Sequence, residues 1–246
     1  VAAADPVTGQ IQWVFKYATS GQKAGGMDRR GTPIIKNPVR WSSTGLILRK
    51  NAVFAAPADC ADVFSLQRSD GRVRWPGRGL CNDPDRKPGK PPGATVLAGI
   101  TRDLLVFAGP RTILVSASTG KRVYEWGVRG GAHPRGRAAV GRKHVLVPDP
   151  EQGLVAIDAE HIVAEAARGD EGMKRIGRYE PEIVGIEGWA RDKRPWTLTL
   201  AFGRLFLAGE AEAYVFAPAP KRVEPEPGAG APEGTGGKRT DEGGRP

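Results

Sequence analysis

The sequence of 246 residues predicts an all-β protein, and three observations point to this fold class. A nine-residue pattern recurs three times with its positions in register. Pairs of short apolar runs separated by turn residues recur between and after its copies. These runs are about five residues long and rich in Val, Ile, Leu and Phe, which is the composition of β-strands. Repeats of this kind bury their apolar faces only by stacking on their neighbours.

The recurring pattern is Asp-x-x-Thr-Gly-x-x-x-Trp, and residues 5–13 match all four of its fixed positions. Residues 67–75 keep the Gly and the Trp but carry Gln and Asp at the other two positions. Residues 116–124 keep the Thr and the Gly, with Ser for Asp and Tyr for Trp. The positions that we expect to have structural roles are Asp5, Gly9, Trp13, Gly71, Trp75, Gly120 and Tyr124, with Asp158 from a fourth, decayed copy.

Hairpins are expected in the middle of each repeat, because two apolar runs flank a turn rich in Gly, Pro and Asp. The four hairpins join 51–55 to 62–66, 103–107 to 112–116, 143–147 to 154–157, and 204–208 to 213–217. A further apolar run precedes each hairpin, at 44–48, 95–100, 137–141 and 196–201. These upstream runs supply a third strand for each repeat.

The fourth strand is expected directly after the glycine of the pattern. Polar and apolar residues alternate in 10–13, 72–75 and 121–126, which fits a half-exposed outer strand. Four short antiparallel strands per repeat form the blade of a β-propeller. We therefore expect about four such blades, plus the end of a preceding one, arranged as an incomplete ring that is truncated at its N-terminus or completed elsewhere.

The pattern decays in the fourth repeat, where Asp158 is kept but Ile162 stands at the glycine position. Residues 159–169 fit a short helix as well as a turn and strand. The fifth repeat keeps only 213–217 before the chain becomes rich in proline. We expect blades over residues 1–217 and a disordered tail rich in Pro, Gly and charge over residues 218–246. The connection at 76–94 has a similar composition and is either functional or disordered.

The formal net charge of +10 raises the question of nucleic-acid binding. The tail from 218 to 246 contributes nothing to it, because its five Lys or Arg and five Asp or Glu cancel. The excess is scattered over the folded part and is not interleaved with aromatic residues, so we expect a solvated basic surface and no nucleic-acid partner. Apolar runs of a few residues also predict no membrane span. No leader is visible at Val1, so the N-terminus does not indicate the compartment.

Cys60 and Cys81 are the two cysteines, and they lack the spacing of a zinc or redox motif. Two buried thiols and a disulfide bridge both remain open, because spacing alone does not supply the geometry of a bridge. His133, His144 and His161 also show no metal-ligand spacing.

The pattern resembles the pyrroloquinoline-quinone-type, or quinoprotein-like, β-propeller repeat, whose blades end in Ala-x-Asp-x-x-Thr-Gly-x-x-x-Trp. In that family the tryptophan ring packs on the neighbouring blade. The resemblance therefore implies that Trp13, Trp75 and Tyr124 are structural residues at blade interfaces.

Proteins with this repeat are of two kinds. Quinoprotein dehydrogenases hold pyrroloquinoline quinone (PQQ) and calcium at the centre of an eight-bladed ring, whereas proteins similar to the BamB-type outer-membrane assembly lipoprotein bind other proteins without a cofactor. The catalytic Asp, the calcium ligands and the adjacent cysteines of the enzymes have no evident counterparts in this sequence. The resemblance thus favours a non-catalytic, cofactor-free scaffold that binds a protein or peptide partner in the periplasm or cell envelope of a bacterium. The alternative is a fragment of a PQQ-dependent alcohol or sugar dehydrogenase.

Overall fold

The computed structural model describes residues 1–18, 23–27, 33–36, 45–60, 62–77, 80, 93–127, 136–149, 153–184, 196–201, 204–208 and 213–216. The predicted disordered tail, most of the 76–94 connection and Cys81 lie outside the described residues.

Three four-stranded antiparallel sheets form the body of the protein, each built from strands in their sequence order. The first contains β5 (Gly45–Arg49), β6 (Ala52–Ala56), β7 (Val63–Gln67) and β8 (Val73–Gly77). The second contains β9 (Val96–Thr101), β10 (Leu104–Ala108), β11 (Thr112–Ser116) and β12 (Arg122–Trp126). The third contains β14 (Ala139–Val140), β15 (His144–Asp149), β16 (Gly153–Asp158) and β17 (Glu182–Val184). This up-and-down order is that of a propeller blade and confirms the predicted fold class.

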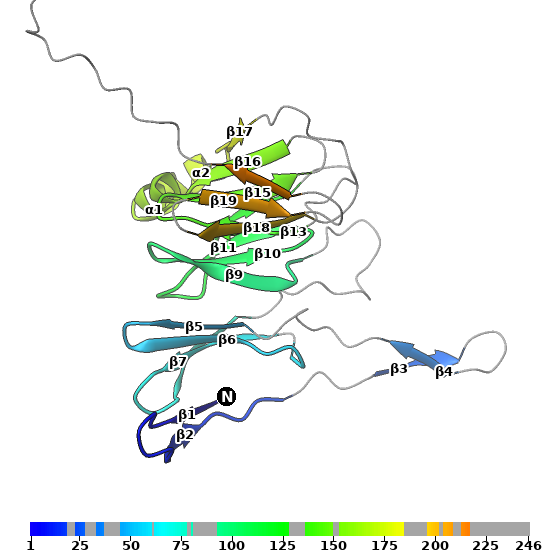
Figure 1. The fold of residues 1–246 in the computed structure, drawn as a ribbon, viewed down its shortest axis with the longest axis vertical. Helices are drawn as coiled ribbons and strands as arrows, with labels where there is room; N and C mark the ends of the chain where they lie inside the picture. The colour runs from blue at the N-terminus through cyan, green and yellow to red at the C-terminus, as the bar shows by residue number, and fades with distance from the viewer. Residues whose placement is uncertain are drawn as a thin grey trace, which may run out of the picture.

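The sheets stack in sequence order, as Figure 1 shows. Their first strands contact one another in succession: β5 contacts β9, and β9 contacts β14. Apolar side chains fill the space between sheets, with Phe54 and Phe107 in the first interface and Val106 and Ile157 in the second. All residues of β6 and β10 are buried, because neighbouring layers cover both faces of these strands. This double burial explains why their sequences are continuous apolar runs.

Two further sheets are incomplete or irregular. At one end of the stack, β1 (Ala2–Ala4) and β2 (Ile11–Val14) form a two-stranded sheet, which is the expected end of a preceding blade. Beside the stack, β18 (Trp196–Ala201), β19 (Arg204–Ala208) and β20 (Ala213–Phe216) form an antiparallel sheet whose strand β18 contacts β14 and β15. The described strands close no ring.

The run at 137–141 differs from the single strand expected there. It is divided between β13 (Gly136–Arg137), which pairs in parallel with β18, and β14, which pairs with β15. The intervening Ala138 is buried, so the chain passes from one sheet to the next inside the core. The last sheet therefore has one parallel edge, unlike the purely antiparallel blade that we expected.

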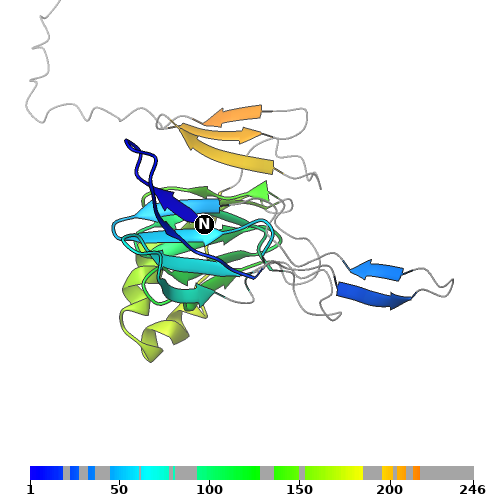
Figure 2. The ribbon, with the colours of Figure 1, turned by 90° about the horizontal axis from the view of Figure 1, so that it is seen from below.

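A further hairpin, β3 (Lys23–Met27) with β4 (Pro33–Lys36), was not predicted. Figures 1 and 2 both show it set apart from the stacked sheets.

The ambiguous segment of the fourth repeat is helical. Helices α1 (Ala159–Ala166) and α2 (Asp170–Ile176) lie between β16 and β17 and displace the outer strand to Glu182–Val184, a position that the sequence did not indicate. Ile162, at the glycine position of the repeat, is fully buried against the same core as Ile176. Neither helix, nor any other in the described part of the chain, is long and apolar enough to cross a membrane.

Candidate functional site

Trp13, on β2, connects the two-stranded sheet to the first complete blade. Its indole Nε1 donates a hydrogen bond to the carbonyl oxygen of Arg68 at 2.8 Å, and the residue is 8% exposed. The ring lies directly over Gly71, where an added Cβ would stand 2.6 Å from Trp13 Cε3. Only glycine therefore fits beneath this indole.

Trp75, on β8, repeats the arrangement between the first and second complete blades. Its Nε1 donates to the carbonyl oxygen of Ala117 at 3.0 Å, and a Cβ added to Gly120 would stand 2.6 Å from Trp75 Cδ2. Arg68 and Ala117 occupy the same position of the repeat, one residue after its first. The two contacts are thus equivalent, and we call each one an indole dock: a Trp ring on the Gly of the next sheet, with its N–H on this carbonyl.

The turn from Asp5 to Gly9 has the same backbone shape as the turns that contain Gly71 and Gly120. The Asp5 carboxylate accepts hydrogen bonds from the backbone N–H groups of Thr8, at 2.9 Å, and Val7, at 2.8 Å. These hydrogen bonds hold the pKa of Asp5 below its usual value, because they stabilise the charged carboxylate. Gly9 closes the turn with a φ of 72°, in the left-handed region where glycine is favoured.

The third blade contact is different because both of its partners have changed. Tyr124 meets Tyr179 edge-on, with ring centroids 5.6 Å apart, and its hydroxyl donates to the Tyr179 carbonyl at 3.5 Å. The Tyr179 hydroxyl accepts from the backbone N–H of Asp158 at 2.8 Å. The Asp158 carboxylate caps α1 by accepting from the backbone N–H of His161 at 3.0 Å. A helical insertion thus replaces the glycine turn where tyrosine replaces tryptophan.

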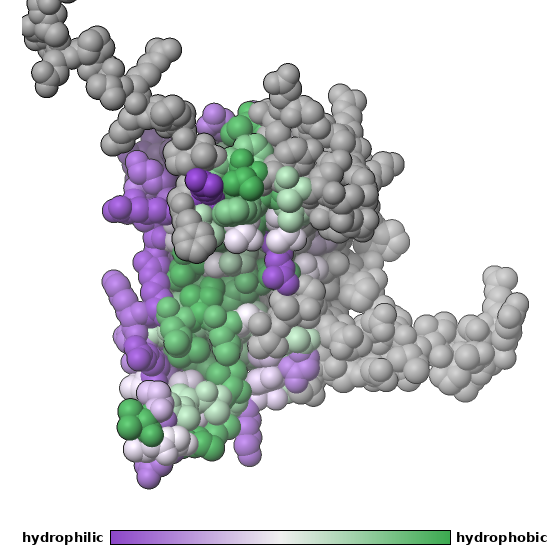
Figure 3. Space-filling view, viewed as in Figure 1, coloured by the Kyte–Doolittle hydropathy of each residue, from purple (hydrophilic) through white to green (hydrophobic). Residues whose placement is uncertain are grey.

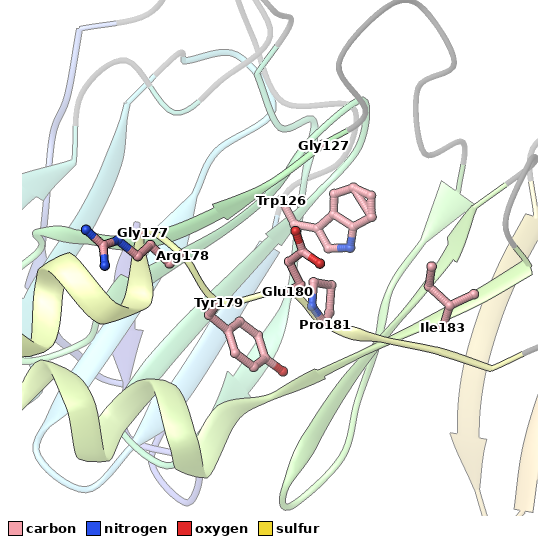
Figure 4. Close-up of a pocket in the computed structure, with 8 residues that line it drawn as sticks. All are labelled: Trp126, Gly127, Gly177, Arg178, Tyr179, Glu180, Pro181 and Ile183. Carbon is pink, nitrogen blue, oxygen red and sulfur yellow. The ribbon is translucent and has the colours of Figure 1, made fainter.

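Next to this contact, the insertion forms an open groove of about 530 Å³, which Figure 4 shows. We call it the insertion groove; its lining residues are Trp126, Gly127, Gly177, Arg178, Tyr179, Glu180, Pro181 and Ile183. One wall is the end of β12 and the other is the chain that leaves α2, so the groove exists only because the helices replace the turn.

Aromatic and acidic groups give the insertion groove its chemistry. In Figure 4 the indole of Trp126 and the carboxylate of Glu180 project into the same region, while the side chain of Arg178 points away. Glu180 and Ile183 are exposed. Trp126 Nε1 is buried and has no hydrogen-bond acceptor among the described residues.

An ion-pair cluster lies on β12, next to Trp126 of the insertion groove. The Glu125 carboxylate pairs with Arg111, which lies in the turn directly before β11. It also pairs with Arg122, whose Nη1 lies 2.6 Å from Glu125 Oε2. Burial alone would raise the pKa of Glu125, but the hydrogen bond from Arg111 and the charge of Arg122 outweigh it, so the pKa is lowered. The cluster is therefore ionised at neutral pH and positions the strand end.

The two tyrosines beside the insertion groove are not general bases. Burial raises the pKa of Tyr124 far above its ordinary value, and the neighbouring Tyr179 raises it further. Burial also raises the pKa of Tyr179. Both phenols are protonated at neutral pH and serve as packing and hydrogen-bonding groups.

A second hollow, of about 400 Å³, lies where the first strands of successive blades meet. It is lined by 96–100 of β9, by 137–140 and by 197–200 of β18. These segments offer aliphatic side chains, hydroxyls and Arg137, and the described lining has no carboxylate. Calcium binds through several oxygen ligands that usually include Asp or Glu, so the lining does not fit a quinoprotein calcium site.

Metal-ligand residues do not gather elsewhere in the described part of the chain, which contains no cluster of three or more His, Cys, Asp or Glu. Cys60 is buried between the two-stranded sheet and the first complete blade. Of the predicted positions, Trp13, Gly71, Trp75, Gly120 and Tyr124 lie at blade contacts, Asp5 and Gly9 form a turn without a docked ring among the described residues, and Asp158 caps α1. None of them lines the insertion groove. Only the departure at Ile162 marked this region in the sequence.

No protein-family model matches the chain, and no curated protein matches it. Among solved structures it is similar to BamB from Moraxella catarrhalis, with 15% identity and a TM-score of 0.44 over 85% of this chain and 50% of that one. It is also similar to the computationally designed Ika4 protein, with 12% identity and a TM-score of 0.45 over 74% of this chain and 94% of that one. It is similar as well to the C-terminal WD40 domain of Sif2, with 12% identity and a TM-score of 0.44 over 76% of this chain and 50% of that one. The chain thus spans half the length of the BamB chain.

Proposed function

We propose that the chain is a non-catalytic β-propeller scaffold of the PQQ-like repeat type that binds a protein or peptide partner in a bacterial cell envelope. The repeat's resemblance to BamB-type proteins supports the envelope location and the cofactor-free state. The insertion groove carries the binding part of the proposal, because it is an open, aromatic-lined hollow on a blade where the repeat itself needs only a turn.

The chemistry of the insertion groove suits an extended peptide with a basic side chain. The Trp126 indole offers a large rigid contact surface, as aromatic residues do at the centre of many interfaces. The exposed Glu180 carboxylate faces the same region and would pair with a Lys or Arg, whose stem would pack on the indole. None of the described lining side chains is a nucleophile paired with a base, so the groove favours binding over catalysis.

Selection from a random peptide library on the full chain tests this proposal. The selected peptides are expected to be enriched in Lys or Arg and to lose roughly tenfold or more in affinity on Glu180→Lys, since a like charge then replaces the partner charge. Glu171→Lys is the matched control, because it makes the same charge change on the exposed face of α2 outside the groove.

Trp126→Ala is expected to weaken the same peptides, measured by calorimetry, while the unfolding transition identifies any loss of fold. If no peptide is enriched, or if the selected peptides bind the Glu180→Lys variant as well as they bind the parent protein, the groove is not the binding site.

A further inference from the structure

Strand β17, the outer strand of the third blade, has one edge that pairs with no other described strand. Among the described strands it pairs only with β16, where Val155 lies opposite Ile183. All three of its residues are exposed, and two of them are apolar: Ile183 is 54% exposed and Val184 is 38% exposed. An unpaired strand edge presents backbone N–H and C=O groups that readily pair with another strand. The edge of β17 is therefore open to strand addition.

The outer strands of the first two complete blades are less suited to receive another strand. Pro76 lies within β8 and has no backbone N–H to donate. Helices α1 and α2 both contact β12, and four of its five residues are partly buried. In contrast, β17 contains no proline and no buried residue. The third blade therefore has the more accessible outer strand.

Acidic residues at β17 determine the charge of the strand that this edge fits. Glu182 is the first residue of β17, and Glu180 lies two residues before it. Both side chains are exposed, and neither carboxylate forms an ion pair with a Lys or Arg among the described residues. Opposite charges on neighbouring strands attract each other, whereas like charges repel. A strand that carries Lys or Arg side chains therefore complements this edge.

Strands β2 and β5 also have an edge that is unpaired among the described strands, but their charges differ from those of β17. β2 contains no carboxylate, and Lys16 follows two residues after its end. β5 ends at Arg49, and Lys50 comes next. Apolar surface gathers over β5 and β9, as Figure 3 shows, yet the cations at the end of β5 would repel a basic strand there. Charge thus favours β17 as the edge for a basic partner.

The insertion groove lies beside β17. Ile183 lines the groove together with Glu180 and Pro181, and Trp126 belongs to its other wall (Figure 4). Residues that lie opposite each other on neighbouring strands point to the same face of a sheet. A strand added to β17 would therefore direct the side chain opposite Ile183, and every second side chain from there, toward the groove.

We propose that the basic peptide bound by the insertion groove pairs with the free edge of β17 as an added β-strand, with alternate Lys or Arg side chains directed into the groove toward Glu180. This proposal rests on the proposed function and specifies how the partner binds. Main-chain hydrogen bonds to β17 supply affinity, and the groove selects the side chains. A second copy of the chain fits this edge poorly, because its own β17 would bring Glu180 and Glu182 against the same two carboxylates.

Amide hydrogen exchange of the full chain, followed by NMR spectroscopy, tests strand addition with one probe, the acetylated and amidated peptide VKVRVKV. Successive N–H groups of a strand point to opposite edges, so at least one N–H of Glu182, Ile183 or Val184 faces the free edge. Saturating probe is expected to slow exchange of that N–H by roughly tenfold or more. Full protection before the probe is added would overturn the proposal, because the edge would already be covered by another part of the chain. Protection that grows with protein concentration would overturn it in favour of a second copy.

Two N-methylated versions of the probe separate strand pairing from side-chain contact, because a methyl group removes a main-chain donor and leaves the side chains unchanged. One version is methylated at its valine nitrogens and the other at its lysine and arginine nitrogens. A strand added on one side uses only alternate N–H groups, so one version is expected to bind like the probe and the other to lose roughly tenfold or more in affinity by calorimetry. Equal affinities of the two versions would overturn strand addition.

Ile183→Lys is expected to weaken the probe by roughly tenfold or more, because a like charge then meets its Lys and Arg side chains. Ile11→Lys is the matched control, since it makes the same substitution at a residue that is 68% exposed on the outer strand β2. The unfolding transition identifies folded variants. A folded Ile183→Lys variant that binds like the parent, or a probe that does not bind at all, would overturn the proposal. The proposed function would still stand if Glu180→Lys weakens the library-selected peptides, and it would fail if that variant binds them unchanged.

Discussion

Substituting the glycines of the repeat one at a time separates the effect of the indole docks from that of the backbone. Gly9, Gly71 and Gly120 have nearly the same φ, 72°, 73° and 72°. Alanine at each position therefore meets the same backbone strain. Among the described residues, Gly71 and Gly120 lie under a tryptophan ring and Gly9 does not, so Gly9→Ala serves as the internal reference.

The expected magnitudes follow from these two effects. A left-handed alanine costs about 1–2 kcal/mol, offset by about 0.4–1 kcal/mol from the stiffer unfolded chain. Gly9→Ala should therefore lower the free energy of unfolding by about 1 kcal/mol. At Gly120 the new Cβ would stand 2.6 Å from Trp75 Cδ2, an overpacked contact that costs a further ~1–3 kcal/mol. Gly120→Ala should therefore lower the free energy of unfolding by about 2–4 kcal/mol.

Urea unfolding followed by far-UV circular dichroism measures both variants under one set of conditions, with the slope of the transition as the check that the unfolding behaviour is unchanged. The Trp75 dock requires that Gly120→Ala is clearly less stable than Gly9→Ala. Equal losses at the two positions would refute the dock, because backbone strain would then account for everything.

Three further predictions concern the Trp75 dock, the ion pairs of Glu125 and the proposal that the chain binds no quinone cofactor. Trp75→Ala should lower the free energy of unfolding by about 3–5 kcal/mol, and Trp75→Phe by less, including ~1 kcal/mol for the lost bond to Ala117; an unchanged melting temperature for Trp75→Ala would contradict this. The pKa of Glu125 is lower in the folded protein than its usual value of 4.5, so its ion pairs stabilise the fold at pH values above 4.5. This stabilisation disappears as the pH falls through the pKa that Glu125 has in the folded protein. Glu125→Gln should therefore flatten the acid dependence of unfolding. Calorimetric titration with PQQ and calcium should give no binding heat, and dye-linked alcohol oxidation would favour the dehydrogenase alternative.

The strands were predictable from the sequence where local composition and burial agree. The apolar runs at 51–55 and 103–107 correspond to β6 and β10, whose two faces are both covered, so no polar residue interrupts them. The glycines at 9, 71 and 120 were conspicuous because a left-handed turn excludes most other residues.

The insertion was harder to predict, because Asp158 serves both possible structures. An aspartate at this position accepts backbone N–H bonds in a tight turn, as Asp5 does, and it also caps a helix. The burial of Ile162 against the core favours the helix. This contact involves strands that are distant in the sequence, so the local sequence does not reveal it.

The insertion groove could not be predicted for a related reason. Its walls, Trp126 and residues 177–183, are far apart in the sequence and are brought together by the two helices. The division of 137–141 between two sheets likewise depends on β18, which pairs with β13 from across the sequence. The hairpin of β3 and β4 lacks the long apolar runs that marked the other strands.

The Hα chemical shifts of Gly9, Gly71 and Gly120 in the unbound protein test the central claim, that tryptophans docked on glycine turns join consecutive blades. The three glycines have nearly the same φ, so a tryptophan ring above a glycine is the main structural difference expected to separate their shifts. The structure predicts upfield-shifted protons at Gly71 and Gly120, with contacts to the Trp13 and Trp75 rings, and ordinary values at Gly9. Ordinary values at all three glycines, without contacts to an indole, would contradict it.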